Sequence, residues 1–174
     1  MRKRNCHGSF IVETPAALWV LFVLFTIPMI DLATVLLRYT FVVAAAHDAS
    51  HSAGKAMSYM SDISAQEASA IHLADAAARA TAAAFAEVTV DSVATRILIT
   101  NLTTRAVTTR TTPLTTPADT GVNLYEYETT VTGRINPLIA FNAGPFAGIP
   151  GLSAPVNVQV TSRQFCENTQ GLMQ

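Results

Sequence analysis

Charged residues are scarce in this 174-residue chain, at 13% of the sequence, where soluble domains have roughly 25%. The formal net charge is -1, so the chain lacks the basic field with which proteins neutralise nucleic-acid phosphates, and we exclude DNA and RNA as partners. Hydrophobic residues make up 50% of the sequence, and they are concentrated near the N-terminus. This uneven distribution predicts contact with a membrane.

Cysteine is also rare, and the two present are too few for a disulfide framework. Cys6 lies in a short basic head and Cys166 lies near the C-terminus. Removal of the head would leave Cys166 without an intramolecular partner. We expect an unpaired thiol at Cys166, with an intermolecular disulfide as the alternative.

Motifs of catalysis are missing as well, since the sequence has no Gly-rich phosphate loop, no nucleophile elbow and no paired-cysteine motif. The nearest pattern is His47-Asp48-Ala49-Ser50-His51, which puts two imidazoles one helical turn apart, as in zinc proteases of the H-E-x-x-H type. Its acid is aspartate instead of glutamate, and His72 is the remaining candidate for a third ligand. We interpret these residues as the polar side of a solvated helix, and we expect no enzyme, metal or cofactor.

What the sequence does have is a basic head followed by a long apolar run. Arg2, Lys3 and Arg4 precede apolar residues from Pro15 to Ile30 and from Leu32 to Leu37. The run far exceeds the roughly 7 to 15 residues of a secretory signal core. Positive flanks stay in the cytoplasm, so the pattern predicts a retained single-pass membrane helix that inserts with its N-terminus inside.

A glycine and a lone carboxylate stand at the junction between the head and the apolar run. If Ser9, after Gly8, becomes the N-terminus, Glu13 lies about 6 Å along the helix axis, where an unpaired carboxylate is costly in a membrane. The freed ammonium of Ser9, on the same or a neighbouring chain, is the nearest cation, and the helix dipole also favours a carboxylate there. Asp31 falls about 33 Å beyond Ser9, which predicts that it emerges at the outer interface of a hydrocarbon layer roughly 30 Å thick.

The basic leader, Gly8, Glu13 and the adjacent apolar helix together resemble the prepilin peptidase site of type IV pilins. The resemblance implies cleavage between Gly8 and Ser9 at the cytoplasmic membrane face, and it implies that Glu13 sets the stagger between subunits in a filament. Two alternatives stay open. One is an uncleaved signal anchor with this spacing by chance, and the other is cleavage after residues 44–46, which would release a soluble protein.

After the apolar run, an alanine-rich stretch predicts that the first helix continues in water to about Met60. Ser64 and Glu67 have the spacing of a capping box, which predicts a second helix from there to about Glu87. We expect His72, Asp75 and Arg79 to look outward, with Asp75 and Arg79 as an i,i+4 pair. The face that we expect to pack on the first helix comprises Ile71, Ala74, Ala78, Ala82 and Phe85.

The remaining sequence predicts strands. Residues 88–90 and 96–100 read as two short strands, and the threonine-rich tract at 103–120 suits a loop or a sheet edge. Strict alternation of apolar and polar residues over 125–132 and 156–161 predicts antiparallel strands with one apolar face, which the helices cover.

Between the two alternating strands lies an apolar stretch rich in Pro and Gly, residues 137–152. It predicts a long packed loop, whose apolar side chains either complete the core or form an exposed subunit contact. The expected architecture is therefore α+β, with a leader at 1–8, a transmembrane and extended helix at 9–60, and a periplasmic domain with a second helix and a small antiparallel sheet at 61–174.

This arrangement resembles the TadE-like pseudopilins of tight-adherence (Tad, Flp) pili. The major Flp pilins are much shorter and have tyrosine after the glutamate, where this chain has Thr14, and that departure implies a minor component. TadG-like proteins carry a large further domain, for which 61–174 has no room. The resemblance implies a subunit that assists pilus assembly or initiation, in the inner membrane or in the extracellular pilus.

The partners that the resemblance implies are prepilin peptidase, other pilins and pseudopilins, and the inner-membrane assembly platform. The competing interpretation is an uncleaved, membrane-anchored periplasmic structural or binding protein that is unrelated to pili.

Overall fold

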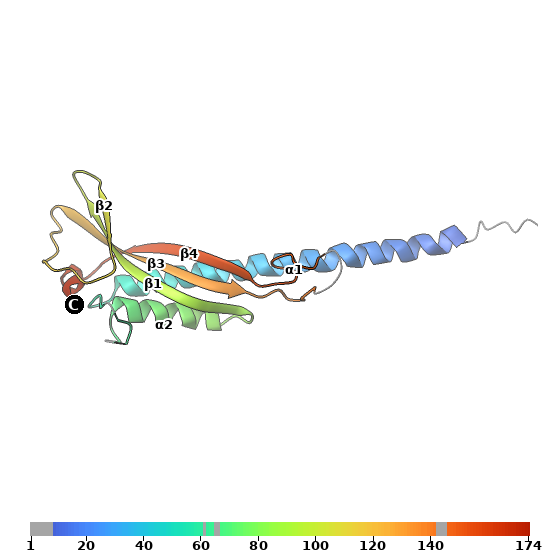
Figure 1. The fold of residues 1–174 in the computed structure, drawn as a ribbon, viewed down its shortest axis with the longest axis horizontal. Helices are drawn as coiled ribbons and strands as arrows, with labels where there is room; N and C mark the ends of the chain where they lie inside the picture. The colour runs from blue at the N-terminus through green and yellow to red at the C-terminus, as the bar shows by residue number, and fades with distance from the viewer. Residues whose placement is uncertain (1–8, 61, 65–66, 142–145) are drawn as a thin grey trace, which may run out of the picture.

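The fold is dominated by one very long helix, α1 (Ser9–Gly54, 46 residues). The computed structural model describes residues 9–60, 62–64, 67–141 and 146–174, with side chains from residue 14 onward. Figure 1 shows the C-terminal half of α1 lying against the sheet and a second helix, while its N-terminal half projects away from them. The helix continues through Pro28, which removes one backbone hydrogen bond from its interior.

The first helix ends at Gly54, so the prediction that it reaches Met60 was wrong. The backbone after it makes contacts that a helix would not allow. The N–H groups of Tyr59 and Met60 both donate to the carbonyl of Gln174, at 2.9 and 2.7 Å, and Ser58 forms an isolated parallel bridge with Ser69. These long-range bonds satisfy the backbone of the connection between the two helices.

The second helix, α2, spans Ala70–Ala83, and the predicted start at a Ser64–Glu67 capping box was wrong. Ser64 instead donates its backbone N–H and its hydroxyl to the carboxylate of Asp62 in a turn. The cap is Ser69, whose hydroxyl oxygen accepts from the His72 N–H. The expected packing face is confirmed at Ala74, Ala78 and Ala82, which are buried together with Ala70.

Two further predictions for the second helix have different outcomes. Asp75 and Arg79 form the expected ion pair, with 2.8 Å between Oδ2 and Nε. Phe85 lies beyond the end of α2, where its ring stacks on that of Phe41 in α1. The helix therefore ends four residues earlier than expected, and Phe85 packs on α1 from the turn that follows.

Four strands form one antiparallel sheet in the order β2-β1-β3-β4. They are β1 (Val88–Asn101), β2 (Val107–Arg110), β3 (Asn123–Ile135) and β4 (Val156–Phe165). The two short strands expected at 88–90 and 96–100 are one strand with a bulge between Val90 and Ser92, because β3 pairs with it along its whole length. The threonine-rich tract contributes the edge strand β2, as expected.

One face of the sheet packs on the helices, which confirms the predicted α+β architecture with one-sided cover. Tyr59, at the end of the helical layer, stacks on Tyr127 with 6.0 Å between ring centroids, and its hydroxyl donates to the Thr95 carbonyl. The opposite face is polar. There the carboxylate of Glu128 accepts from Arg96 at 2.6 Å and from Arg163 at 2.7 Å, so the charge of this buried side chain is paired.

Candidate functional site

The N-terminal half of α1 is the most unusual surface of the molecule, because large apolar side chains are exposed along it. Trp19 is 69% exposed, Phe22 65% and Phe25 56%. Within the part of the chain that the structure describes, the stretch Thr14–Gly54 of α1 is long and apolar enough to cross a membrane, as a membrane anchor or as a signal sequence. An apolar surface of this extent marks a membrane or protein contact.

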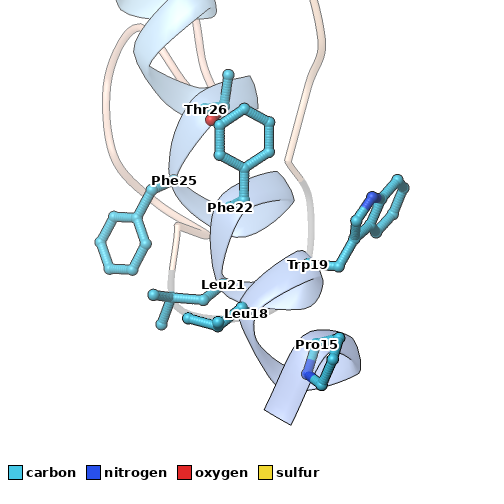
Figure 2. Close-up of a pocket in the computed structure, with 7 residues that line it drawn as sticks. All are labelled: Pro15, Leu18, Trp19, Leu21, Phe22, Phe25 and Thr26. Carbon is cyan, nitrogen blue, oxygen red and sulfur yellow. The ribbon is translucent and has the colours of Figure 1, made fainter. Parts of the chain in front are cut away.

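Figure 2 shows seven side chains around the projecting part of α1. They line a shallow concavity, and the described residues that line it all belong to α1: Pro15, Leu18, Trp19, Leu21, Phe22, Phe25 and Thr26. A concavity made by one helix has no opposing wall that would enclose a small ligand. Its chemistry is that of a face against which lipid tails or another helix pack.

A second face of α1 is buried, and it extends further toward the N-terminus than the sheet does. Val42, Ala46 and Ala49 on this face lie in the core beneath the sheet. The same spacing of three or four residues leads back to Asp31 and Pro28, which are also buried. Their cover is the connection between β3 and β4, described for residues 136–141 and 146–155, which we call the β3–β4 loop.

Asp31 is the polar centre of this junction. It is only 1% exposed, and its Oδ1 accepts the backbone N–H groups of Leu138 at 2.5 Å and Ile139 at 3.4 Å. Its Oδ2 has no hydrogen-bond partner among the described residues. A buried carboxylate that accepts backbone N–H groups fixes their position strongly, so Asp31 fastens the β3–β4 loop to α1.

Two more contacts hold the ends of the loop. At its start, Arg38 Nη1 donates to the Asn136 carbonyl at 2.7 Å, and the Asn136 side chain donates to Glu87 at 2.9 Å. Near its end, Gly151 is buried with φ of +85°, a conformation that other residues rarely adopt. A Cβ atom at Gly151 would lie 3.7 Å from Leu32 Cδ2, so the backbone of the loop runs close along α1.

The expectation that the apolar stretch 137–152 completes the core holds in part, while the expected subunit contact stays a prediction. Leu152 is buried at 4% exposure, and its carbonyl accepts the Phe141 N–H at 2.8 Å, so one side of the loop completes the core. Leu138, Ile139 and Ile149 remain 53%, 46% and 41% exposed. The loop therefore has a packed side and an exposed apolar side.

The residues of the predicted processing site lie at the margin of the structure. Arg2, Lys3, Arg4 and Gly8 lie outside the described residues. Ser9 is the first residue of α1, and Glu13 follows one turn later, where the structure describes the backbone. The predicted cleavage point therefore lies at the boundary of the described residues, and cleavage there stays a prediction.

The two histidines of the predicted pattern lie one turn apart on the exposed surface of α1. His47 and His51 are exposed, with ring centroids 6.4 Å apart, while the Asp48 carboxylate accepts the Thr81 hydroxyl at 2.9 Å. Among the described residues no group of three or more His, Cys, Asp or Glu side chains could hold a metal ion. Asp48, the acid of this pattern, contributes instead to the contact between α1 and α2.

Cys166 is a free thiol in the core, next to Tyr127. Burial raises the pKa of this thiol above its ordinary value, so the thiolate that disulfide formation needs is depleted. Both the burial and the raised pKa oppose an intermolecular disulfide at Cys166.

The sequence predicts that Asp31 lies at a membrane interface, but it does not identify the hydrogen-bond partner of Asp31. The sequence does indicate that Asp31 needs a partner, because a lone carboxylate inside an apolar run requires a hydrogen-bond donor. The donors are the backbone N–H groups of Leu138 and Ile139, and a backbone group has no sequence signature of its own.

Removal of the Asp31 carboxylate should release the loop. In the Asp31→Ala variant, we expect hydrogen exchange at the Leu138 and Ile139 amides to accelerate about tenfold or more, because leaving a buried donor unpaired costs about 1–3 kcal/mol. Asp31→Asn keeps one acceptor oxygen and should have a smaller effect. Hydrogen–deuterium exchange with mass spectrometry on the full-length chain in detergent measures both.

The matched control is Thr34→Ala, which removes a hydroxyl that donates only to the Ile30 carbonyl within α1, at 2.8 Å. This variant should leave exchange in the loop unchanged. Equal exchange in Asp31→Ala and in the unaltered protein would show that Asp31 does not hold the loop.

Comparison of the chain with protein-family models, curated proteins and solved structures finds no match.

Proposed function

We propose that this protein is a minor pilin-like subunit, a pseudopilin of a Tad-type pilus or related secretion machine. In this proposal the N-terminal half of α1 anchors the subunit in the bacterial inner membrane, and the sheet domain stands in the periplasm. Prepilin peptidase removes residues 1–8. The observation that carries the proposal is the order of a basic head, Gly8, Ser9 and Glu13 along the sequence, directly before a helical stretch whose apolar side chains, such as Leu18 and Phe22, are exposed.

The division of α1 into two parts supports this function. A subunit that is stored in a bilayer and later assembled needs a helix that exchanges lipid for protein neighbours, and the exposed side chains of Leu18, Phe22 and Phe25 suit both surroundings. The C-terminal half of the same helix is the core of the sheet domain. When the exposed half of α1 packs into an assembly, the sheet domain is therefore brought into the assembly as well, because the same helix runs through both.

The leader and the new N-terminus have separate roles. Arg2, Lys3 and Arg4 hold the leader at the cytoplasmic face until cleavage. Gly8 allows the peptidase to approach the backbone closely. Cleavage frees the ammonium of Ser9, which pairs with Glu13 of the same or a neighbouring subunit and sets the register between them.

The chain supplies no chemistry of its own in this scheme, because the peptidase performs the hydrolysis and this protein is its substrate. Its other partners are pilins and pseudopilins, which pack on α1, and the inner-membrane assembly platform. A minor role, in priming or capping assembly, fits the presence of a sheet domain after the anchor.

The test is the N-terminus of the mature chain. We expect intact-mass measurement of the purified protein to give a chain that begins at Ser9 when active prepilin peptidase is present, and at Met1 when the peptidase is inactivated. Gly8→Leu should block conversion even with active enzyme, because a bulky side chain obstructs the approach to the bond. Asn5→Leu, elsewhere in the leader, is the matched control and should be processed normally.

Two other outcomes would contradict the proposal. A chain that keeps residues 1–8 in the presence of active peptidase would favour the uncleaved, membrane-anchored periplasmic protein. A chain that begins after residues 44–46 would favour a released soluble domain.

A further inference from the structure

We propose that the exposed side of the β3–β4 loop enters the outer headgroup region of the same bilayer that holds α1, so that the sheet domain has a second membrane contact. The side chains involved are Leu138, Ile139 and Ile149. This inference rests on the membrane-anchoring part of the proposed function, and it is independent of cleavage and of pili.

The loop continues the apolar surface of the anchor. It is docked on α1 at Asp31 and beside Leu32. Near this dock, Met29 is 69% exposed and Ile30 is 53% exposed on α1 itself. The exposed apolar side chains of the loop and of the helix therefore lie at the same height along the axis of α1.

The level of the dock matches the thickness of a bilayer. Asp31 lies about 33 Å along the helix from Ser9, and the hydrocarbon layer is roughly 30 Å thick. With Ser9 at the inner boundary, the loop lies at the outer one. Arg38, which holds the start of the loop, then lies on the headgroup side of Asp31.

The loop is also free of charge, since the sequence has no Asp, Glu, Lys or Arg between Arg134 and Arg163. A loop that faces water usually contains polar and charged residues, whereas apolar insertion into a membrane requires their absence. Three prolines in the described loop, Pro137, Pro150 and Pro155, further reduce the number of backbone donors.

Most of the backbone N–H groups along the described loop are satisfied within the protein. Asp31 takes those of Leu138 and Ile139. The remaining described bonds run from Phe141 to Leu152, from Gly148 to the Ser153 hydroxyl, from Ile149 to Phe146, from Gly151 to Ala154, and from Leu152 and Ser153 to Ile149. Irregular backbone is tolerated near hydrocarbon only when its polar groups are paired in this way.

We choose lipid as the occupant of this surface because the surface is continuous with the membrane-spanning face of α1. A second copy of the chain would also bury apolar side chains, and the experiment separates the two. Lipid contact at the loop would set the tilt of the sheet domain on the membrane, because α1 and the loop then touch the bilayer at two points.

The experiment uses the full-length chain in phosphatidylcholine–phosphatidylglycerol vesicles with brominated acyl chains, which quench tryptophan on contact. Trp19 is the only tryptophan in the sequence, so Trp19→Phe provides a silent background. In that background, we expect Ile149→Trp to be quenched about threefold more by bromolipid than Val107→Trp, because interfacial apolar side chains lie among the upper acyl carbons. Val107 is 57% exposed in β2, at the opposite end of the sheet from the loop (Figure 1).

The controls separate this inference from the anchoring itself. Bromolipid quenching of Trp19 in the unaltered chain reports insertion of α1, and its absence would overturn the anchor together with the loop contact. Quenching of Trp19 combined with equal quenching of Ile149→Trp and Val107→Trp would overturn the loop contact alone. Protection of Ile149→Trp that grows with the protein-to-lipid ratio, without bromolipid quenching, would assign the surface to a second copy and overturn lipid as the occupant.

Leu138→Trp provides a second probe on the same surface, at a side chain that is 53% exposed. It should be quenched like Ile149→Trp, and it replaces that variant if the substitution at Ile149 prevents folding. Its failure to be quenched while Trp19 is quenched would count against the loop contact in the same way.

Discussion

Replacement of Glu13 by alanine is expected to leave cleavage after Gly8 intact and to reduce incorporation of the subunit into pili or pilus-assembly complexes about 30-fold. An unpaired charge within a membrane helix costs roughly 2.5–3.5 kcal/mol near the bilayer centre. If about 2 kcal/mol of such a cost is recovered when Glu13 meets a Ser9 ammonium, loss of the carboxylate corresponds to a factor of about 30. Immunoblotting of the sheared surface fraction and of affinity-purified assembly complexes measures incorporation.

Three further variants distinguish the effect of the charge at position 13 from the effects of side-chain shape and of an unrelated substitution in α1. Glu13→Gln keeps the shape without the charge and should fail like Glu13→Ala, whereas Glu13→Asp keeps the charge and should retain part of the incorporation. Thr34→Ala, a change elsewhere in the apolar part of α1, should assemble normally. Normal incorporation of both neutral Glu13 variants would remove the role in registration that we give to this residue.

Gly171→Ala should destabilise the sheet domain by about 3 kcal/mol, at the upper end of the range for overpacked positions. A Cβ atom on Gly171 would collide with the backbone carbonyl of Met57, which cannot move aside like the end of a side chain. Gly171 lies in the short 3-10 helix Thr169–Met173, and its own carbonyl accepts the Tyr59 N–H at 3.1 Å. The collision would therefore separate the C-terminal segment from the connection between α1 and α2.

Urea unfolding of the full-length chain in detergent, followed by circular dichroism, measures this effect. The control is Gly121→Ala, where the nearest atom to the added Cβ is Asp119 Oδ1 at 3.3 Å on the exposed surface. That variant should change the free energy of unfolding by less than about 0.5 kcal/mol. Equal unfolding midpoints for the two variants would mean that the contact between Gly171 and Met57 adapts without loss.

The elements that the sequence predicted well are those with a regular pattern. Alternation over 125–132 identified β3, and the alanine spacing at 74, 78 and 82 identified the face of α2 that packs on α1. In both cases the burial of each residue follows from its neighbours a few positions away. Local periodicity was therefore sufficient to predict both elements.

The errors arose where a local competition or a distant partner decided the structure. The capping-box spacing at Ser64 does not start a helix, because the backbone N–H of Ser64 donates a hydrogen bond to the Asp62 carboxylate instead. Residues 91–95 stood outside the two predicted short strands, but pairing with β3 carries β1 across them with a bulge between Val90 and Ser92. Strand pairing of this kind cannot be read from one segment alone.

The junction at Asp31 was the least predictable part of the candidate site. Its acceptor and donor are 107 positions apart in the sequence, and the donor is a backbone group. The exposure of Leu138 and Ile149 was equally hidden, because one apolar loop places Leu152 inward and these side chains outward. The proposed processing motif, in contrast, is contiguous in the sequence, and it stays a prediction.

Because α1 runs from Ser9 to Gly54 as one helix, the direction in which the sheet domain faces around the helix axis is fixed relative to the side chains of the N-terminal half of α1. Each residue of an α-helix turns the chain by about 100°. In the proposed assembly, the side of the domain that a neighbouring subunit would meet is therefore decided by the number of residues between Ser9 and Val42, where the core begins. Under that proposal, helical phase would determine which parts of adjacent subunits face each other, in addition to the chemistry of the surface.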